Sequence, residues 1–317
     1  MKTHRRQLPQ LNGQLFLSDG GLETTLIFHE GMDLPYFAAF DLLKQQAGTR
    51  VLRQYFTRYA ELAEECGVGA VLESPTWRAN PDWAAKLGYN AGSLAEANRR
   101  GIELLEEIRE ASGAPLESIV ISGNLGPRGD GYRAETRMTA HRARDYHAPQ
   151  VEVFADTAAD MVAAFTMNYV EEAIGITLAA QQADMPVAIS FTVETDGRLP
   201  SGQTLKEAIE RTDDATAGEP VYYMINCAHP SHFENVLRTD GAWRDRIRGV
   251  RANASKRSHA ELDTCPDLDA GNPSELGDDY RLLRRLLPQL SVLGGCCGTD
   301  DRHVAAICRA CQEDLVM

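Results

Sequence analysis

The sequence predicts an α/β fold in the form of a single (β/α)8 TIM barrel. Short apolar runs alternate with helical stretches along the 317 residues, and this alternation can be followed through eight units. Alternation of this kind implies a parallel sheet, because parallel neighbours need a crossover connection. Eight units in a chain of this length favour a closed barrel over a doubly wound sheet. No Gly-x-Gly-x-x-Gly opens a helix after the first strand, which argues against a dinucleotide-binding fold.

The apolar runs give the expected strands, and the stretches between them give the helices. Strands are expected at 15–19, 69–73, 118–122, 160–164, 187–191, 222–226, 249–252 and 290–293. Helices are expected near 42–66, 94–111, 150–156, 169–182, 204–210, 231–237, 276–287 and 302–311. No linker or charged block divides the chain, so we expect residues 1–317 to form one barrel domain.

Composition excludes several classes of protein. The formal net charge is -14, from 46 acidic and 32 basic residues, which argues against a nucleic-acid binder because such proteins need a basic face. No apolar stretch is long enough to span a membrane, and no apolar region follows the basic N-terminus, so we expect a cytoplasmic protein. The seven cysteines are an odd number, which favours free thiols or metal ligands over a disulfide framework.

Three short segments follow directly on expected strands: Asp19-Gly-Gly21, Asn226-Cys227 and Gly294-Gly-Cys-Cys-Gly298. In a barrel, chemistry gathers at the carboxyl ends of the strands, so these segments should converge on one rim. Cys227, Cys296 and Cys297 would then supply three ligands to a zinc ion and leave its fourth position open. Three thiolates make a soft site that suits another thiolate, and zinc binding deprotonates a coordinated thiol.

Other interpretations of these cysteines stay open at this point. Cys227 could be a buried apolar residue, and the adjacent pair could be core residues or a vicinal disulfide. A closed structural zinc site could instead use Cys296, Cys297, Cys308 and Cys311, since the last two share one face of an expected helix.

The same motifs carry a resemblance to the homocysteine S-methyltransferase family. Its first-strand, sixth-strand and closing motifs resemble Asp19-Gly-Gly-Leu-Glu-Thr24, Asn226-Cys-Ala-His-Pro230 and Gly294-Gly-Cys-Cys-Gly-Thr299, and the match runs from about residue 15 to 310. The resemblance implies zinc on Cys227, Cys296 and Cys297, which would be the catalytic residues. It implies a methyl transfer from a sulfonium or betaine-type donor to a small thiol such as homocysteine, bound as a zinc thiolate.

The resemblance also implies residues for substrate binding. Asp19 would help bind the amino-acid part of the acceptor, together with Ser74 and Asn226. Trp77 is expected to form an aromatic wall for the cationic donor, because aromatic faces attract onium ions. His229 and the Arg-rich connection 127–142 fit structural and solvated roles. A homo-oligomer is possible, and neither a nucleic acid nor a membrane is expected as a partner.

The amino-acid end of the site departs from the family pattern. Phe165 stands where the family has a glutamate that binds the substrate ammonium, and the seventh strand ends in Arg251. We therefore expect sulfur chemistry with an acceptor that could differ from homocysteine. Glu23, Glu73 or Glu194 could bind an ammonium instead, while Arg251 and Lys256 could favour a carboxylate.

Two other functions remain as alternatives. One is a zinc-dependent hydrolase or lyase on the same barrel, which is less attractive because three thiolates weaken zinc as a Lewis acid. The other is a non-catalytic homologue that binds a thiol or zinc. Fold alone does not separate these possibilities, because barrels support many chemistries.

Overall fold

Eight parallel strands close into a barrel in the order of the sequence, which confirms the predicted fold. The computed structural model describes residues 4–115, 118–135 and 137–313. The strands are β1 (Phe16–Leu17), β2 (Gly69–Glu73), β3 (Ile119–Leu125), β4 (Met161–Met167), β5 (Val187–Phe191), β6 (Tyr222–Asn226), β7 (Ile247–Ala252) and β8 (Val292–Gly295). Strand β1 pairs with both β2 and β8, and this pairing closes the ring.

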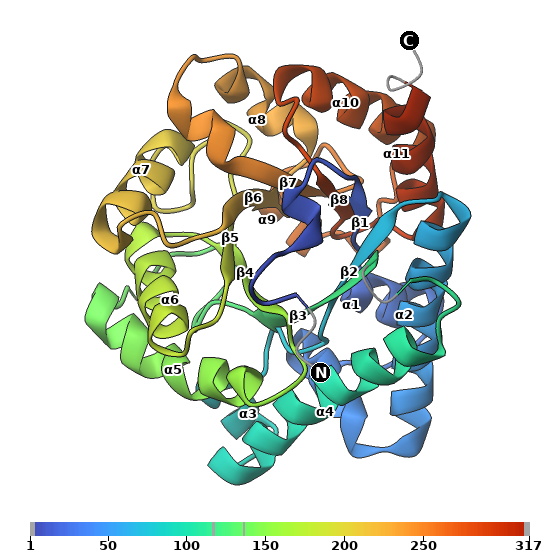
Figure 1. The fold of residues 1–317 in the computed structure, drawn as a ribbon, viewed down its shortest axis with the longest axis vertical. Helices are drawn as coiled ribbons and strands as arrows, with labels where there is room; N and C mark the ends of the chain where they lie inside the picture. Colours follow the sequence, from blue (N-terminus) through green and yellow to red (C-terminus); the bar gives the residue numbers. More distant parts are fainter. Residues whose placement is uncertain (1–3, 116–117, 136, 314–317) are drawn as a thin grey trace.

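Helices surround the ring of strands on the outside (Figure 1). The α-helices are α1 (Leu22–Thr24), α2 (Gln46–Glu65), α3 (Pro81–Lys86), α4 (Ala91–Ala111), α5 (Ala140–Ala155), α6 (Val170–Gln182), α7 (Leu205–Thr216), α8 (Pro230–Leu237), α9 (His259–Asp263), α10 (Pro273–Leu286) and α11 (Asp301–Glu313). Shorter helical turns are η1 (Pro9–Leu11), η2 (Thr25–His29), η3 (Pro35–Phe37), η4 (Ala39–Lys44) and η6 (Ala242–Arg246). No helix in the described part of the chain is long and apolar enough to cross a membrane.

All eight expected strands are present in the structure. Strands β2, β5 and β6 have the predicted bounds, and the bounds of the other five differ by up to three residues. Helix α5, in contrast, begins at Ala140, ten residues before the expected start at 150. Its start is marked by Thr139, whose side chain accepts a hydrogen bond from the backbone N–H of Arg142. The weak periodicity of its first turns and the internal Pro149 conceal this helix in the sequence. Helices α1, α3 and α9 were not predicted.

Side chains alternate between the barrel interior and the surrounding helices along each strand. Val71, Ala163 and Met224 belong to one buried apolar cluster inside the barrel. Two residues further along each strand, the inward-facing positions form the next layer, towards the carboxyl ends. That layer holds Glu73, Ser122, Phe165, Ser190, Asn226 and Arg251. Most of it is polar or charged, so the apolar core ends where this layer begins.

The N-terminal segment covers the amino-terminal end of the barrel. Leu8 belongs to the interior apolar cluster, and the backbone N–H of His4 donates to Asp160 Oδ1 at 3.0 Å. Figure 1 shows this dark-blue segment lying across the ring of strands. Arg109 also pairs with Asp160, at 2.8 Å, and both side chains are buried. This end is therefore closed, and the site has to be sought at the other end.

Candidate metal centre and substrate site

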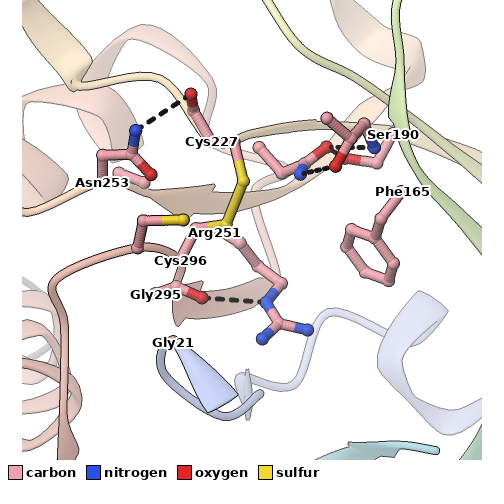
Figure 2. The surroundings of a disulfide bond; sticks show 12 residues. Gly21, Phe165, Ser190, Cys227, Arg251, Asn253, Gly295 and Cys296 are labelled. Atoms are coloured by element: carbon pink, nitrogen blue, oxygen red, sulfur yellow. Dashed lines mark hydrogen bonds between the residues drawn. A yellow bond between two sulfur atoms is a disulfide. The ribbon is translucent and has the colours of Figure 1, made fainter. Parts of the chain in front are cut away.

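Three cysteines meet at the carboxyl-terminal end of the barrel. Cys227 follows β6 directly, and Cys296 and Cys297 follow β8 directly. Their sulfur atoms all lie within 4.8 Å of one another, and they form the only cluster of three or more metal-ligating side chains within the described ranges. Cys227 and Cys296 are joined as a disulfide, shown in Figure 2. Once this bond is reduced, three thiolates are available to one soft metal ion.

The backbone around the cysteines is held in unusual conformations. Cys227 has a positive φ of 52°, and its carbonyl accepts a hydrogen bond from Asn253 Nδ2 at 3.0 Å and a second from His259 Nε2. Positive φ in a residue other than glycine costs free energy, and such residues cluster at functional sites. At Gly21 a Cβ would lie 2.5 Å from the carbonyl oxygen of Cys296, so only glycine fits against the cysteine loop.

Cys297 is the third sulfur and lies beneath the loop after β3. Its Sγ is 3.9 Å from the hydroxyl of Tyr132, whose ring stacks on His259 with centroids 4.1 Å apart. Burial, and then the nearby Glu23 carboxylate, raise the pKa of Cys297 to about 11. The raised pKa means that the protonated thiol is favoured in the absence of a metal. A bound cation would favour the thiolate instead, because coordination stabilises it. The donor set thus fits a thiophilic metal.

A buried ion pair occupies the position predicted to bind the acceptor's amino-acid part. Asp19 Oδ1 lies 2.8 Å from Arg251 Nη2, and Tyr55 donates to Asp19 Oδ2 at 3.0 Å. Arg251 Nε donates to the carbonyl of Gly295, and its guanidinium lies 5.0 Å from the centroid of the Phe165 ring. In Figure 2 the guanidinium extends from beside the disulfide towards the Gly21 loop, with the Phe165 ring next to it. Asp19 is therefore already paired within the protein.

Two further carboxylates lie close to this ion pair. Glu73 is 3% exposed, and its Oε2 has no hydrogen-bond partner in the described structure. Burial raises the pKa of Glu73 to about 7, although the Arg251 charge opposes the rise. Burial also raises the pKa of Glu23 to about 7, and the Asp19 charge contributes. Sequence reasoning named both residues only among several alternatives, because their electrostatic interaction with Arg251 depends on the closure of the barrel.

The other predicted substrate residues have partners within the protein. Asn226 Oδ1 accepts from Ser190 Oγ at 2.6 Å and from the backbone N–H of Thr166 at 2.9 Å. Ser74 Oγ accepts from the backbone N–H of Asn124. The Arg78 guanidinium lies 4.0 Å from the Trp77 ring centroid, so a cation of the protein itself covers one face of that ring. Direct contact of Asn226, Ser74 and Trp77 with substrate stays a prediction.

Two expectations for the surroundings of the site need correction, and one agrees with the structure. Cys308 and Cys311 are buried in the core between the barrel and its helices, so they do not join Cys296 and Cys297 in a four-cysteine site. The connection after β3 is not simply a solvated loop, since its Tyr132 reaches Cys297. His229 has the expected structural role, because its ring accepts from the backbone N–H of Ser231 at the start of α8.

A cavity of about 390 Å³ lies elsewhere, on the outer side of the residues that hold Asp19. Tyr55 and Tyr59 line it together with Glu30, Arg58 and charged residues of α11, whereas the three cysteines do not. Tyr132 contacts Cys297 in the sulfur cluster, away from this cavity. The candidate site is therefore identified by the position of the three thiols and not by the cavity.

Fold and site together define a (β/α)8 barrel with a cluster of three cysteines, which could hold a metal ion, at the carboxyl ends of its strands. A sequence profile of the homocysteine S-methyltransferase family matches residues 16–311. The chain therefore belongs to the homocysteine S-methyltransferase family, and it is a methyltransferase.

Similar proteins agree with this assignment. Homocysteine S-methyltransferase 4 of Zea mays is 23% identical over 93% of this chain and 89% of its own length. Selenocysteine Se-methyltransferase of Brassica oleracea is 24% identical over 95% of this chain and 90% of its own. Crystal structures of the Escherichia coli homocysteine methyltransferase in metallated and oxidised forms share the fold. Their TM-scores are 0.72 and 0.73, with 19% and 20% identity, covering 94% and 93% of this chain and 96% and 95% of theirs.

Proposed function

We propose that this protein is a zinc-dependent methyltransferase that moves a methyl group from a sulfonium or betaine-type donor to a small thiol such as homocysteine. The observation that carries the proposal is the cluster of Cys227, Cys296 and Cys297 sulfurs, all within 4.8 Å, at the mouth of the barrel. The names of the similar proteins, which act on homocysteine or selenocysteine, support a thiol acceptor.

The three cysteines would hold the zinc, which would supply a Lewis acid that favours the deprotonated form of the acceptor thiol. The acceptor sulfur then attacks the methyl carbon in line. The new S–C bond forms as the carbon–onium bond breaks, and the electron pair of the broken bond goes to the departing heteroatom. The thiol proton leaves to solvent. Tyr132 and its loop limit the access of water to Cys297.

Zinc content tests the proposal directly. Freshly reduced wild type should contain about one zinc per chain, and Cys297→Ser should lose it. Cys265→Ser is a matched control, because Cys265 lies outside the cluster. Methyl transfer to homocysteine from S-methylmethionine or glycine betaine should fall by more than about 100-fold in Cys297→Ser. Substituting a residue that only hydrogen-bonds to a metal ligand already lowers metal affinity or activity about 10- to 100-fold. Zinc retained by Cys297→Ser would refute this site.

The same assays address the alternatives. Release of product from a thioether or carbonyl substrate without any methyl donor would indicate a hydrolase or lyase. Thiol binding with no turnover from either donor would indicate a non-catalytic protein. Membership of a methyltransferase family favours the transfer reaction over both.

A further inference from the structure

The charges around Arg251 define what the acceptor must carry at the end away from its sulfur. Arg251 and Asp19 neutralise each other as an ion pair. Glu73 and Glu23 remain, and neither forms an ion pair with another described residue. The inner end of the site therefore carries surplus negative charge in a buried environment. A ligand that brings a positive charge is favoured there, and one that brings only a carboxylate is opposed.

Of these two carboxylates, Glu73 is the better placed to contact a positively charged group of a ligand. It is the last residue of β2, two positions beyond Val71, which faces the barrel interior. Its side chain is therefore directed inward, and Oε2 is buried without a partner. A buried carboxylate oxygen without a partner is costly, and a cationic group of a bound ligand would satisfy it. Glu23 lies nearer the sulfur end, because its charge is among those that act on Cys297.

Arg251 can still bind an anion although it is paired. Its Nε donates to Gly295 and its Nη2 to Gly20, and Nη2 also contacts Asp19. Its Nη1 has no hydrogen-bond partner among the residues that the structure describes. A guanidinium fixed on one side by the protein presents its remaining N–H groups in a defined direction. An α-carboxylate can accept from Nη1.

We propose that Glu73 and Arg251 together recognise the two charges of an amino-acid thiol, Glu73 binding the α-ammonium and Arg251 Nη1 the α-carboxylate. This inference rests on the proposed function and deepens it. It chooses between the residues that the sequence offered for binding the ammonium and the carboxylate. Phe165 on β4 stands where the family has a glutamate, and Glu73 supplies a carboxylate from β2 instead. Glu194 is bound to His259 and Lys256 is paired with Glu275, so both have other partners.

Three thiols with the same spacing between the sulfur and each charged group test this assignment. Homocysteine carries both charges, 4-mercaptobutyrate lacks the ammonium, and 3-aminopropanethiol lacks the carboxylate. Their dissociation constants are measured by calorimetry on reduced, zinc-loaded protein. Wild type should bind homocysteine at least about 10-fold more tightly than either analogue, because a hydrogen bond to a charged group contributes this much.

The variant Glu73→Gln isolates the ammonium contact. The preference for homocysteine over 4-mercaptobutyrate should fall about 10-fold or more, while affinity for 4-mercaptobutyrate itself stays the same or improves. Glu73→Asp keeps the charge and should keep part of the preference. Glu194→Gln is the matched control and should keep all of it, since that carboxylate faces His259.

The outcomes separate this inference from the function on which it rests. Equal binding of homocysteine and 4-mercaptobutyrate by wild type would overturn the inference and indicate a carboxylate-only acceptor. An unchanged preference in Glu73→Gln would overturn it too, and a loss in Glu23→Gln instead would assign the contact to Glu23. If none of the three thiols binds the zinc-loaded wild type, the proposed function itself fails, and this inference fails with it.

Discussion

The two ends of the barrel each contain a buried arginine–aspartate pair with the same 2.8 Å separation, yet the pairs have different surroundings. At the amino-terminal end, Asp160 Oδ2 accepts from Arg109 and from the backbone N–H of Ile121, and Oδ1 accepts from His4. At the carboxyl-terminal end, the pair of Asp19 and Arg251 has further carboxylates beside it.

This difference separates a structural ion pair from a binding site. At the amino-terminal end, both oxygens of Asp160 have partners within the protein, so the charges balance without a ligand. At the other end, Glu73 Oε2 lacks a hydrogen-bond partner among the described residues, so the balance is incomplete. In barrels, polar residues at the amino-terminal end serve stability, and those at the carboxyl-terminal end serve catalysis or binding. The criterion here is whether a buried charge finds its partner inside the chain.

Removing the arginine at the amino-terminal end should give the largest effect on stability alone. Arg109→Met leaves Asp160 buried without its cation, and breaking a buried pair from one side costs about 3–5 kcal/mol. Urea unfolding measures the loss. Thiol affinities of the folded variant should stay as in wild type. A variant that kept its stability but lost homocysteine preference would contradict the structural role of this pair.

Removing the arginine at the carboxyl-terminal end should affect both the stability of the protein and its preference among thiols. Arg251→Met removes the partner of Asp19, with a stability loss of up to about 3–5 kcal/mol. It should also reduce the preference for homocysteine over 3-aminopropanethiol by about 10-fold, because the carboxylate contact is lost. Calorimetry with the two thiols provides the comparison. The same stability loss with an unchanged preference would make this pair equivalent to the one at the other end.

Neutralising Glu73 should stabilise the ligand-free protein, whereas the two arginine substitutions should destabilise it. Burial raises the pKa of Glu73 to about 7, above its ordinary value of 4.5, so the folded state binds its proton more tightly than the unfolded state. This group therefore lowers stability as pH rises from about 4.5 to about 7, and the full cost is present above pH 7. The Arg251 charge limits the cost, and Asp19 increases it.

Glu73→Gln removes this cost. The gain at pH 8 should be at most about 3–4 kcal/mol, since each pKa unit corresponds to about 1.4 kcal/mol, and it should shrink as pH falls towards 5. Urea unfolding at several pH values, with Glu194→Gln in parallel, measures it. Higher stability together with weaker homocysteine binding would show that Glu73 is kept for binding. A destabilised variant at pH 8 would instead make Glu73 a structural partner of Arg251.

The sequence predicts the sulfur end of the site much better than the amino-acid end. Cys227, Cys296 and Cys297 are identifiable because few residue types can bind a soft metal, and because each follows an expected strand directly. The pairing of Asp19 with Arg251 joins residues 232 positions apart, in the segment after β1 and on β7. Only barrel closure brings them together.

The direction of Glu73 depends on the register of β2, which a short apolar run does not fix. Tyr132 was missed for a similar reason. Its loop carries no periodic signal, and its contact with Cys297 crosses 165 positions of sequence. The eight strands themselves were predicted within a few residues, because their apolar runs are separated by well-marked helices and turns.

Lys256→Ala should have the smallest effect and provides the last test of the comparison. Lys256 follows β7 near Arg251 in the sequence, and it is the other cation that could have bound the acceptor's carboxylate. Its side chain is 64% exposed and lies 3.7 Å from Glu275, whose side chain is 65% exposed. Exposed pairs contribute about 0–1 kcal/mol, so stability should hardly change. The affinity for homocysteine, measured by the same calorimetry, should stay within about twofold of wild type, because solvent screens this charge from the buried site. A loss of affinity comparable to that in Arg251→Met would show that the acceptor's carboxylate is bound at the rim and not inside the barrel.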